Sequence, residues 1–282
     1  MPLASYTSLR VGGPVDALAL PRSADAVVEL LSWARRRGVP VLPLGSGFNL
    51  LVRDGGVRGV AVHPRGLRRL VLERDGGLRA EAGVRHSSIS RLCAERGRAG
   101  LEFAVGIPGT VGGWIAMNAG TREREMKDVV LSVEWWTPEG DVEERDAAQL
   151  EFEYRSARLP PGAFILGARF RTSPDSPAAV ETRMQSLMEA RRYTQPLDRL
   201  SCGSVFRNPP GDSAGRLIEA AGLKGARRGG AEISSLHANF IVNRDRACAR
   251  DVLELIALAR ESVWRRFAVA LEPEVRIVGV DP

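Results

Sequence analysis

Residues 106–113 read GIPGTVGG, and residues 118–120 continue as Asn-Ala-Gly. A second glycine-rich stretch, GSGFN, occupies residues 45–49 directly after an apolar run. Glycine has no Cβ, so several backbone N–H groups in such a stretch can point at one anion without a side chain in the way. Four polar residues in these stretches add side-chain donors: Ser46, Asn49, Thr110 and Asn118. Together the two loops predict a site for a phosphate or pyrophosphate group.

Taken alone, either loop fits an ordinary turn better than a ligand site. Neither matches the G-x-G-x-x-G fingerprint of a dinucleotide-binding strand–helix unit, and neither is a P-loop. The presence of two such loops in one basic chain favours a pyrophosphate cradle over two unrelated turns.

The net charge and its distribution limit the kinds of partner that the protein could bind. The chain has 282 residues and a net charge of +6, and its only lysines are Lys127 and Lys224. The arginines are spread along the chain, so a solvated surface explains them better than a nucleic-acid patch. A basic cleft for an anionic nucleotide substrate and cofactor is a third interpretation.

The three cysteines, Cys93, Cys202 and Cys248, match no disulfide framework or zinc site. The first residues lack the apolar core of a signal peptide, and no run approaches the length of a membrane span. We therefore expect a cytoplasmic protein that contacts neither membrane nor nucleic acid and holds no metal.

Apolar patterning predicts three segments with boundaries at 1–65, 66–173 and 174–282. The first should alternate strands with a helix that Ser23 caps and Gly38 closes, the strands covering residues 16–20, 39–44 and 59–63. The second should be richer in strands, with hairpins around residues 75–77 and 138–141 and a helix ended by Gly97.

A strand over residues 164–172 should close the second segment, and residues 172–177 read as a linker. The apolar pattern of the third segment predicts an amphipathic helix around Val180–Met188, a second long helix reaching Phe267, and a final strand over residues 271–278. Trp135 and Trp136 are adjacent in a predicted strand, so their side chains should point to opposite faces.

A series of motifs, in order along nearly the whole chain, resembles the UDP-N-acetylenolpyruvoylglucosamine reductase family. The segments are 6–14 (YTSLRVGGP), 49–56 (NLLVRDGG), 100–104 (GLEFA), 106–113 (GIPGTVGG), 154–156 (YRS), 201–211 (SCGSVFRNPPG), 217–225 (LIEAAGLKG), 237–243 (HANFIVN) and 271–276 (LEPEVR).

The resemblance implies an α+β fold class. An FAD-binding PCMH domain of the vanillyl-alcohol-oxidase type would consist of two α+β subdomains, residues 1–65 and 66–173. A C-terminal α+β substrate-binding domain would follow, residues 174–282. The short stretch between Arg155 and Gly203 implies the type II form, which lacks an extra substrate-covering segment.

The resemblance also implies the chemistry. The family reduces UDP-N-acetylglucosamine enolpyruvate, a nucleotide sugar, to UDP-N-acetylmuramate in peptidoglycan precursor synthesis. NADPH is the reductant and FAD is bound without a covalent bond, although His63 and His86 raise the alternative of a tethered flavin. We expect a monomer.

Residue roles carry over position by position. Arg155 and Glu274 match the residues that stabilise charge on the substrate carboxylate, and Ser204 matches the proton donor; Glu274 can donate a hydrogen bond only when protonated. Positions that match substrate contacts are Tyr154, Arg207 and Asn208. Positions that match cofactor contacts are Gly45, Ser46, Gly47, Phe48, Asn49, Gly106, Ile107, Pro108, Gly109, Thr110, Gly112, Gly113 and Asn118.

Two departures from the family pattern affect the flavin loops. Phe48 stands where a small polar residue is expected, which puts one side-chain contact in doubt. Residues 121–124, Thr-Arg-Glu-Arg, replace an expected small turn that contains glycine.

Plainer interpretations stand beside these. Taken alone, Arg155, Ser204 and Glu274 would be surface or turn residues. Lys224 and Glu219 fit packing or a helix surface equally well, Cys202 reads as a small loop residue rather than a nucleophile, and His237 as structural. The rival functions are a PCMH-type oxidoreductase acting on another alcohol or sugar, and a basic nucleic-acid-binding protein.

Overall fold

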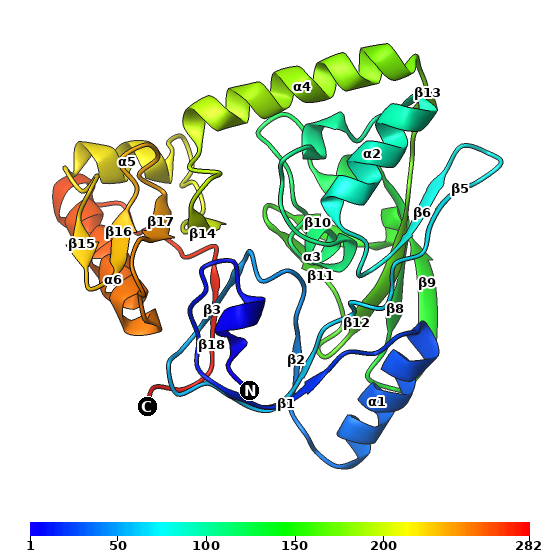
Figure 1. Ribbon diagram of the computed structural model, residues 1–282, viewed down its shortest axis with the longest axis horizontal. Coiled ribbons are helices and arrows are strands. Elements are labelled where there is room, and N and C mark those ends of the chain that lie inside the picture. Colours follow the sequence, from blue (N-terminus) through cyan, green and yellow to red (C-terminus); the bar gives the residue numbers. More distant parts are fainter. The chain divides into compact units, whose positions relative to one another are not determined.

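The computed structural model describes residues 1–282 and divides into two compact units (Figure 1). Unit 1 combines residues 1–17, 46–58 and 191–282, and unit 2 combines residues 18–45 and 59–190. Both units mix helices with strands, which confirms the predicted α+β class. The boundaries predicted at residues 65 and 173 stay predictions, because compact units built from separate stretches do not locate the ends of a cofactor-binding subdomain.

An antiparallel sheet in the order β5-β6-β12-β8-β9 forms the centre of unit 2. Its strands are β5 (Leu70–Leu72), β6 (Leu78–Glu81), β8 (Val130–Trp136), β9 (Val142–Asp146) and β12 (Phe164–Phe170). Both predicted hairpins are confirmed, since β5 pairs with β6 and β8 with β9. Gly76 and Gly140 supply the left-handed residues of the two turns, with φ of 86° and 110°.

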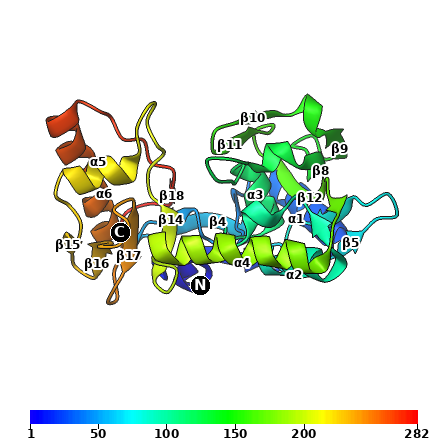
Figure 2. The same ribbon diagram turned by 90° about the horizontal axis from the view of Figure 1, so that it is seen from above.

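Helices α2 (His86–Arg96), α3 (Val111–Ala116) and α4 (Pro177–Thr194) pack on one face of this sheet (Figures 1 and 2). Their apolar residues share one core with β6, β8 and β12, including Ile89, Trp114 and Val180. As predicted, α2 ends at Gly97, which is left-handed with φ of 56°.

Helix α1 (Ala24–Arg36) contributes to a second, smaller core with Trp136, Phe164 and Leu166. The hydroxyl of Ser23 accepts a hydrogen bond from the Ala26 N–H at 3.2 Å, as the predicted N-cap requires.

A bulge in β12 lets neighbouring residues serve both cores. The register shifts between Ile165 and Gly167, so Leu166 faces the α1 core whereas Ala168 faces the α2 core. Trp135 and Trp136 also divide between the two cores, which confirms that they point to opposite faces.

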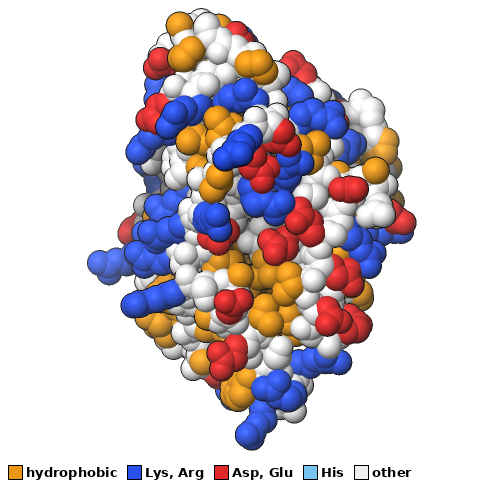
Figure 3. Space-filling model, turned by 90° about the vertical axis from the view of Figure 1, so that its right-hand side faces the viewer, with side chains coloured by type: hydrophobic (Ala, Val, Ile, Leu, Met, Phe, Trp, Pro, Cys, Tyr) orange, Lys and Arg blue, Asp and Glu red, His pale blue; other side chains and the backbone are white.

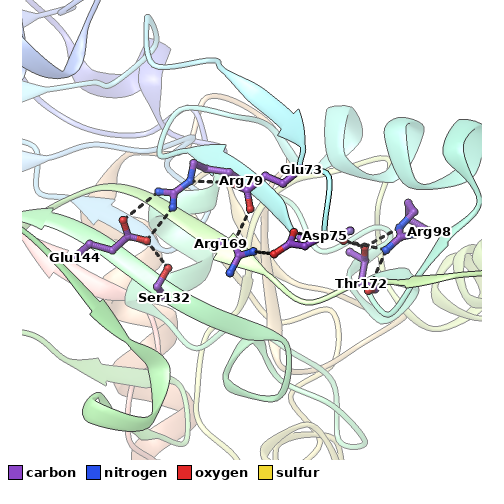
Figure 4. Close-up of polar contacts among 10 residues, drawn as sticks. Glu73, Asp75, Arg79, Arg98, Ser132, Glu144, Arg169 and Thr172 are labelled. Atoms are coloured by element: carbon purple, nitrogen blue, oxygen red, sulfur yellow. Dashed lines mark hydrogen bonds and ion pairs between the residues drawn. The ribbon is translucent and has the colours of Figure 1, made fainter.

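Ion pairs cover part of the sheet beyond the apolar cores (Figure 4). Arg79 of β6 bonds Glu144 of β9 at 3.0 Å and Glu73 at 3.2 Å. Arg169 of β12 joins the same Glu73 and also Asp75 of the β5–β6 turn. These alternating charges thus connect β6, β9 and β12 with the turn between β5 and β6.

Unit 1 is built on an antiparallel sheet in the order β14-β17-β16-β15, against which α5 and α6 pack. The elements are β14 (Leu200–Ser204), α5 (Ala214–Ala220), β15 (Arg227–Arg228), β16 (Ala231–Ile233), β17 (Phe240–Asn243) and α6 (Ala249–Phe267). The predicted stripe on α6 is confirmed as core, with Val252, Leu255, Ile256, Ala259 and Val263 buried.

The two ends of the chain meet in unit 1. Strand β18 (Arg276–Val278) pairs in parallel with β3 (Leu50–Val52), and Arg276 lies opposite Leu50. Leu9, Val11 and Leu51 join the core formed by the C-terminal residues. The N-terminal motifs are therefore part of the same unit as residues 191–282.

Smaller elements complete the fold. They are η1 (Leu3–Tyr6), β1 (Val15–Ala19), β2 (Val41–Pro43), β4 (Val57–Val62), β7 (Arg98–Ala99), η2 (Glu102–Ala104), η3 (Met126–Asp128), η4 (Ala147–Gln149), β10 (Glu151–Glu153), β11 (Ser156–Arg158) and β13 (Ser173–Pro174). A mixed sheet has the order β1-β4-β2, with β2 and β4 parallel.

Three expectations need correction. The linker predicted over residues 172–177 contains β13, which pairs with β7. The strand predicted over residues 271–278 is regular only at 276–278, because Pro273 has no N–H to continue a ladder. Residues 111–113, the end of the predicted second glycine loop, form the first turn of helix α3 rather than a loop.

Basic and acidic side chains are interspersed on the face that includes the β5–β6 hairpin (Figure 3). This distribution agrees with the interpretation of the arginine excess as solvated surface on that face. No helix is both long enough and apolar enough to cross a membrane.

Candidate active site

The first glycine loop, residues 45–49, is held in place by backbone contacts that only glycine permits. Gly47 is left-handed with φ of 68°, and a Cβ there would lie 2.3 Å from the carbonyl oxygen of Tyr6. The Ser8 N–H and hydroxyl both donate to the Gly47 carbonyl, at 3.2 and 3.0 Å. Ser46 is half-buried and Phe48 is exposed.

Asn49 ends this loop and contacts the C-terminal segment of unit 1. Its Nδ2 donates to the Glu274 carbonyl at 3.1 Å, and its own carbonyl accepts the Arg276 N–H at 3.2 Å. A residue predicted to contact the cofactor therefore also positions the backbone of a predicted catalytic residue.

The second glycine loop enters α3 at Thr110, whose side chain is buried. Gly106 and Gly109 have φ of 73° and 133°, backbone conformations that other residues rarely adopt. Gly112 packs against Ala82, so a Cβ there would come within 3.2 Å of that side chain. Ile107 is half-buried beside the α2 core, and its carbonyl accepts the Trp114 indole N–H at 3.3 Å.

Thr110 Oγ1 is buried and has no hydrogen-bond partner. A Cβ built on Gly45 would lie 3.1 Å from this oxygen and meet no other atom within 4 Å, and one built on Gly113 would likewise meet only this oxygen, at 4.0 Å. Buried hydroxyls are normally hydrogen-bonded, so the missing partner points to a ligand. The arrangement fits an anionic group, such as a cofactor phosphate, lying against these glycines.

Asn118 is fully buried and its side chain is engaged within the protein. Its Nδ2 donates to Glu125 Oε2 at 3.0 Å and to the Glu153 carbonyl at 2.9 Å, and its Oδ1 accepts the Lys127 N–H at 2.9 Å. Both amide hydrogens are thus used by protein oxygens. A direct bond from this amide to the cofactor stays a prediction.

Arg155 occupies the turn between β10 and β11 in unit 2. The pairing of Glu153 with Ser156 leaves Tyr154 and Arg155 as the two turn residues. The guanidinium carbon lies 5.0 Å from the centre of the Tyr154 ring, and Nη1 lies 3.5 Å from Glu125 Oε1. The Arg155 side chain is only 16 % exposed, so its charge is held in a partly buried position.

Ser204 and Glu274 come together in unit 1. Ser204 ends β14 after the left-handed Gly203, and the carbonyl of the following residue, Val205, accepts the Glu274 N–H at 2.7 Å. A hydroxyl and a carboxyl group predicted to act on one substrate thus belong to adjacent backbone segments, although 70 positions separate them in sequence.

The predicted substrate residues Arg207 and Asn208 lie shortly after Ser204 in the sequence. The Arg207 N–H donates to the Glu272 carbonyl at 2.9 Å, and Arg207 Nε is buried without a hydrogen-bond partner. Asn208 Oδ1 accepts the Ala214 N–H at 3.0 Å, so this side chain also fixes the start of α5. The third substrate residue, Tyr154, is 42 % exposed in unit 2.

The plainer interpretations hold at several positions. Burial raises the pKa of the Cys202 thiol to about 12, so it is protonated at neutral pH and is a poor nucleophile. His237 Nδ1 accepts the Asn239 N–H at 3.2 Å, a structural role. Lys224 and Glu219, for which packing and helix surface were equally plausible, form an ion pair at 2.8 Å.

Glu125 is a candidate site residue that the sequence motifs do not reveal. Its carboxylate contacts Asn118, Lys127 and Arg155. The available signal was its place directly after the unusual turn at residues 121–124, but a turn alone does not indicate which side chain points at Arg155.

Comparison with known proteins places the chain among reductases. Residues 195–278 match the C-terminal domain of UDP-N-acetylenolpyruvoylglucosamine reductase, and residues 15–145 match an FAD binding domain. A relative of that name from Anaeromyxobacter dehalogenans (strain 2CP-C) is 50% identical over 281 residues, covering 100% of this chain and 85% of the relative. One from Moorella thermoacetica is 44% identical over 278 residues, covering 99% of this chain and 92% of the relative.

A solved structure is similar throughout. The crystal structure of UDP-N-acetylenolpyruvylglucosamine reductase from Thermus caldophilus matches with a TM-score of 0.85 and 36% sequence identity. The match covers 98% of this chain and 97% of the other.

Proposed function

The chain belongs to the UDP-N-acetylenolpyruvoylglucosamine reductase family, and we propose that it reduces the enolpyruvyl ether of UDP-N-acetylglucosamine to UDP-N-acetylmuramate. It is an FAD-dependent oxidoreductase with NADPH as reductant, and its product is a precursor of peptidoglycan. Family membership agrees with the predicted order of an FAD-binding domain and a C-terminal domain.

The residues present fit the cofactor. Bound FAD would supply hydride-transfer chemistry between NADPH and the enolpyruvyl group. Thr110 Oγ1 would donate to a phosphate oxygen, and Gly45 and Gly113 would leave room for that group. Gly47 and Asn49 would shape the first loop, with Gly106 and Gly109 shaping the second.

Arg155 and Glu274 would act on the substrate carboxylate. Negative charge builds on these oxygens when the β-carbon accepts a hydride, giving an enolate-like species. A permanently charged guanidinium and a protonated carboxyl group would both stabilise it more strongly than the ground state.

Ser204 would deliver the proton that the α-carbon then needs. A serine hydroxyl is a weak acid, so its competence depends on position beside a strongly basic carbanion. The observation that carries this assignment is the 2.7 Å bond from the Glu274 N–H to Val205, the residue after Ser204. This bond supports the assignment because it joins the backbone segments that carry Ser204 and Glu274.

Arg207, Asn208 and Tyr154 would contact the nucleotide part of the substrate. Arg207 Nε is buried without a protein partner, as expected for a group that meets a ligand phosphate. We infer that the enzyme works as a monomer in the cytosol, without nucleic acid, where its free thiols stay reduced. Light scattering, which measures the molar mass of the purified protein in solution, tests whether it is a monomer.

One experiment tests the function. The purified protein should be yellow, release one intact FAD per chain on denaturation, lose its visible absorbance with NADPH, and recover it with UDP-N-acetylglucosamine enolpyruvate. UDP-N-acetylmuramate should form in equal amount. A protein that binds FAD and oxidises NADPH but is not reoxidised by this substrate would contradict the proposed substrate.

A further inference from the structure

Arg155 has a backbone conformation that needs support from its surroundings. It is left-handed with φ of 58°, a region that non-glycine residues rarely adopt because their Cβ crowds the backbone. Glycine or asparagine would occupy this turn position more easily. Because the conformation fixes the direction of the Cα–Cβ bond, it also sets the direction in which the Arg155 side chain leaves the backbone.

The Glu125 carboxylate meets that guanidinium and is itself firmly held. Asn118 Nδ2 and Lys127 Nζ both contact Oε2, at 3.0 and 3.1 Å, whereas Oε1 faces Arg155 Nη1 at 3.5 Å. One oxygen is therefore anchored and the other is presented to Arg155. The Glu125 side chain is 13 % exposed, so water competes weakly for these contacts.

Asn118 connects the carboxylate to the β10–β11 hairpin that carries Arg155. It donates to Glu125 and to the carbonyl of Glu153, the last residue of β10 and two positions before Arg155. Asn118 is itself left-handed, with φ of 41°. The turn holding Glu125 and the hairpin holding Arg155 are thus bound through one fully buried side chain.

The backbone of Glu125 is fixed as well. Glu125 is the N-cap of η3, and its N–H donates to Asp128 Oδ2 at 2.8 Å in a capping box. The backbone and the carboxylate of Glu125 are therefore both held by protein contacts in the absence of substrate.

We propose that Glu125 is a positioning residue for Arg155: its anchored carboxylate, through Asn118, holds the guanidinium in the orientation that receives the substrate carboxylate. This inference rests on the proposed role of Arg155. It assigns Glu125 no contact with the substrate, and it gives Asn118 a function that does not require contact with the cofactor.

Glu125→Asp is the sharpest test. Aspartate keeps the charge and is a good N-cap, so η3 should form. The side chain is shorter by one methylene, about 1.5 Å, and can no longer reach both Asn118 and Arg155. Because small misplacements of a positioned group can cost about 10²-fold, reoxidation of the reduced enzyme by the enolpyruvyl substrate should slow about 10- to 100-fold. Reduction by NADPH should stay near the wild-type rate.

A binding measurement without turnover gives a second readout. In calorimetric titration of the oxidised enzyme with UDP-N-acetylmuramate, whose carboxylate remains, Glu125→Asp and Arg155→Ala should both weaken binding. Glu102→Gln is the matched control, since Glu102 is equally buried and pairs with Arg183 at 2.7 Å outside the cluster. It should change neither the reoxidation rate nor product affinity.

The double variant separates positioning from other roles. If Glu125 acts through Arg155, then Glu125→Asp should have no further effect in an Arg155→Ala background. Full-rate reoxidation of Glu125→Asp, or an equal loss in both backgrounds, would overturn the proposal while leaving the proposed function intact. Full-rate reoxidation of Arg155→Ala would instead remove the catalytic role of Arg155, and the positioning role of Glu125 with it.

Discussion

Replacing Thr110 by valine tests whether the buried hydroxyl of the second glycine loop serves the cofactor. Valine has nearly the shape of threonine, so the change removes one O–H and little else. Thr110 is 3% exposed, and its Oγ1 has no protein partner. An unsatisfied buried group costs about 1–3 kcal/mol, so the apoprotein should become more stable by up to that amount in Thr110→Val.

The sign reverses when FAD is bound. A hydrogen bond from the hydroxyl to a phosphate oxygen is worth about 1.5–3 kcal/mol, and the variant loses it. The dissociation constant for FAD should therefore rise about 10- to 150-fold. A more stable apoprotein with a weaker cofactor complex is a combination that a purely structural threonine does not produce.

Two measurements on apoprotein check this: thermal unfolding by circular dichroism, and titration with FAD followed by flavin fluorescence. Thr137→Val is the control, because Thr137 is 2% exposed and its Oγ1 accepts the Asp141 N–H at 3.3 Å in the β8–β9 turn. It should lose about 1 kcal/mol of stability and keep its FAD affinity. Thr110→Val with unchanged FAD affinity and a less stable apoprotein would refute the reasoning.

Three further outcomes are expected. Arg155→Ala and Glu274→Gln should each slow stopped-flow reoxidation by the enolpyruvyl substrate, with the double variant losing much less than the sum, because both stabilise one developing charge; equal losses in reduction by NADPH would point to a role in folding instead. Ser204→Ala should slow product formation about 10²-fold or more while flavin reduction stays intact, and a wild-type rate with collapsed NADPH oxidation would place the acid elsewhere. The hydrogen bond from Arg169 lowers the pKa of Glu73 from 4.5, so this pair stabilises the fold above that pH and its contribution fades as the pH falls through the lowered pKa; Glu73→Gln should therefore show a smaller loss of unfolding temperature between about pH 6 and pH 3 than the wild type, and an identical loss would contradict the assignment.

Local signals account for the elements that the sequence predicts well. The cap at Ser23, the left-handed Gly97 and the glycines of the two hairpin turns act within a few residues, and each lies where it was expected. The alternation of Trp135 and Trp136 depends only on the two-residue period of a strand. Such features need no knowledge of distant segments.

The bulge in β12 shows where this reasoning stops. A strict two-residue period would place Leu166 and Ala168 on one face, yet they pack in different cores. The register shift that separates them is imposed by pairing with β8. Since the partner strand lies some 30 positions away in sequence, the apolar pattern of residues 164–170 does not show where the register shifts.

The same limit applies to the candidate site. Motif order identified Arg155, Ser204 and Glu274 as proposed site residues, but not what holds them. Glu125 lies against Arg155 at a place where Asn118 joins two segments 35 positions apart in sequence. A carboxylate in a polar turn looks like solvated surface until that contact is known.

Asn49 and Glu274 connect the predicted cofactor loop to a predicted catalytic residue within unit 1. The Asn49 amide donates to the Glu274 carbonyl and the Asn49 carbonyl accepts the Arg276 N–H, so two hydrogen bonds flank Glu274 across 225 positions of sequence. The parallel pairing of β3 with β18 starts at the next residue, Leu50 opposite Arg276. The side-chain amide and the backbone carbonyl of Asn49, the last residue of the first glycine loop, thus hold the segment that carries Glu274. A shift of this loop that left Glu274 behind would break both hydrogen bonds and leave their polar groups unpaired, so we expect the loop and the Glu274 segment to move together.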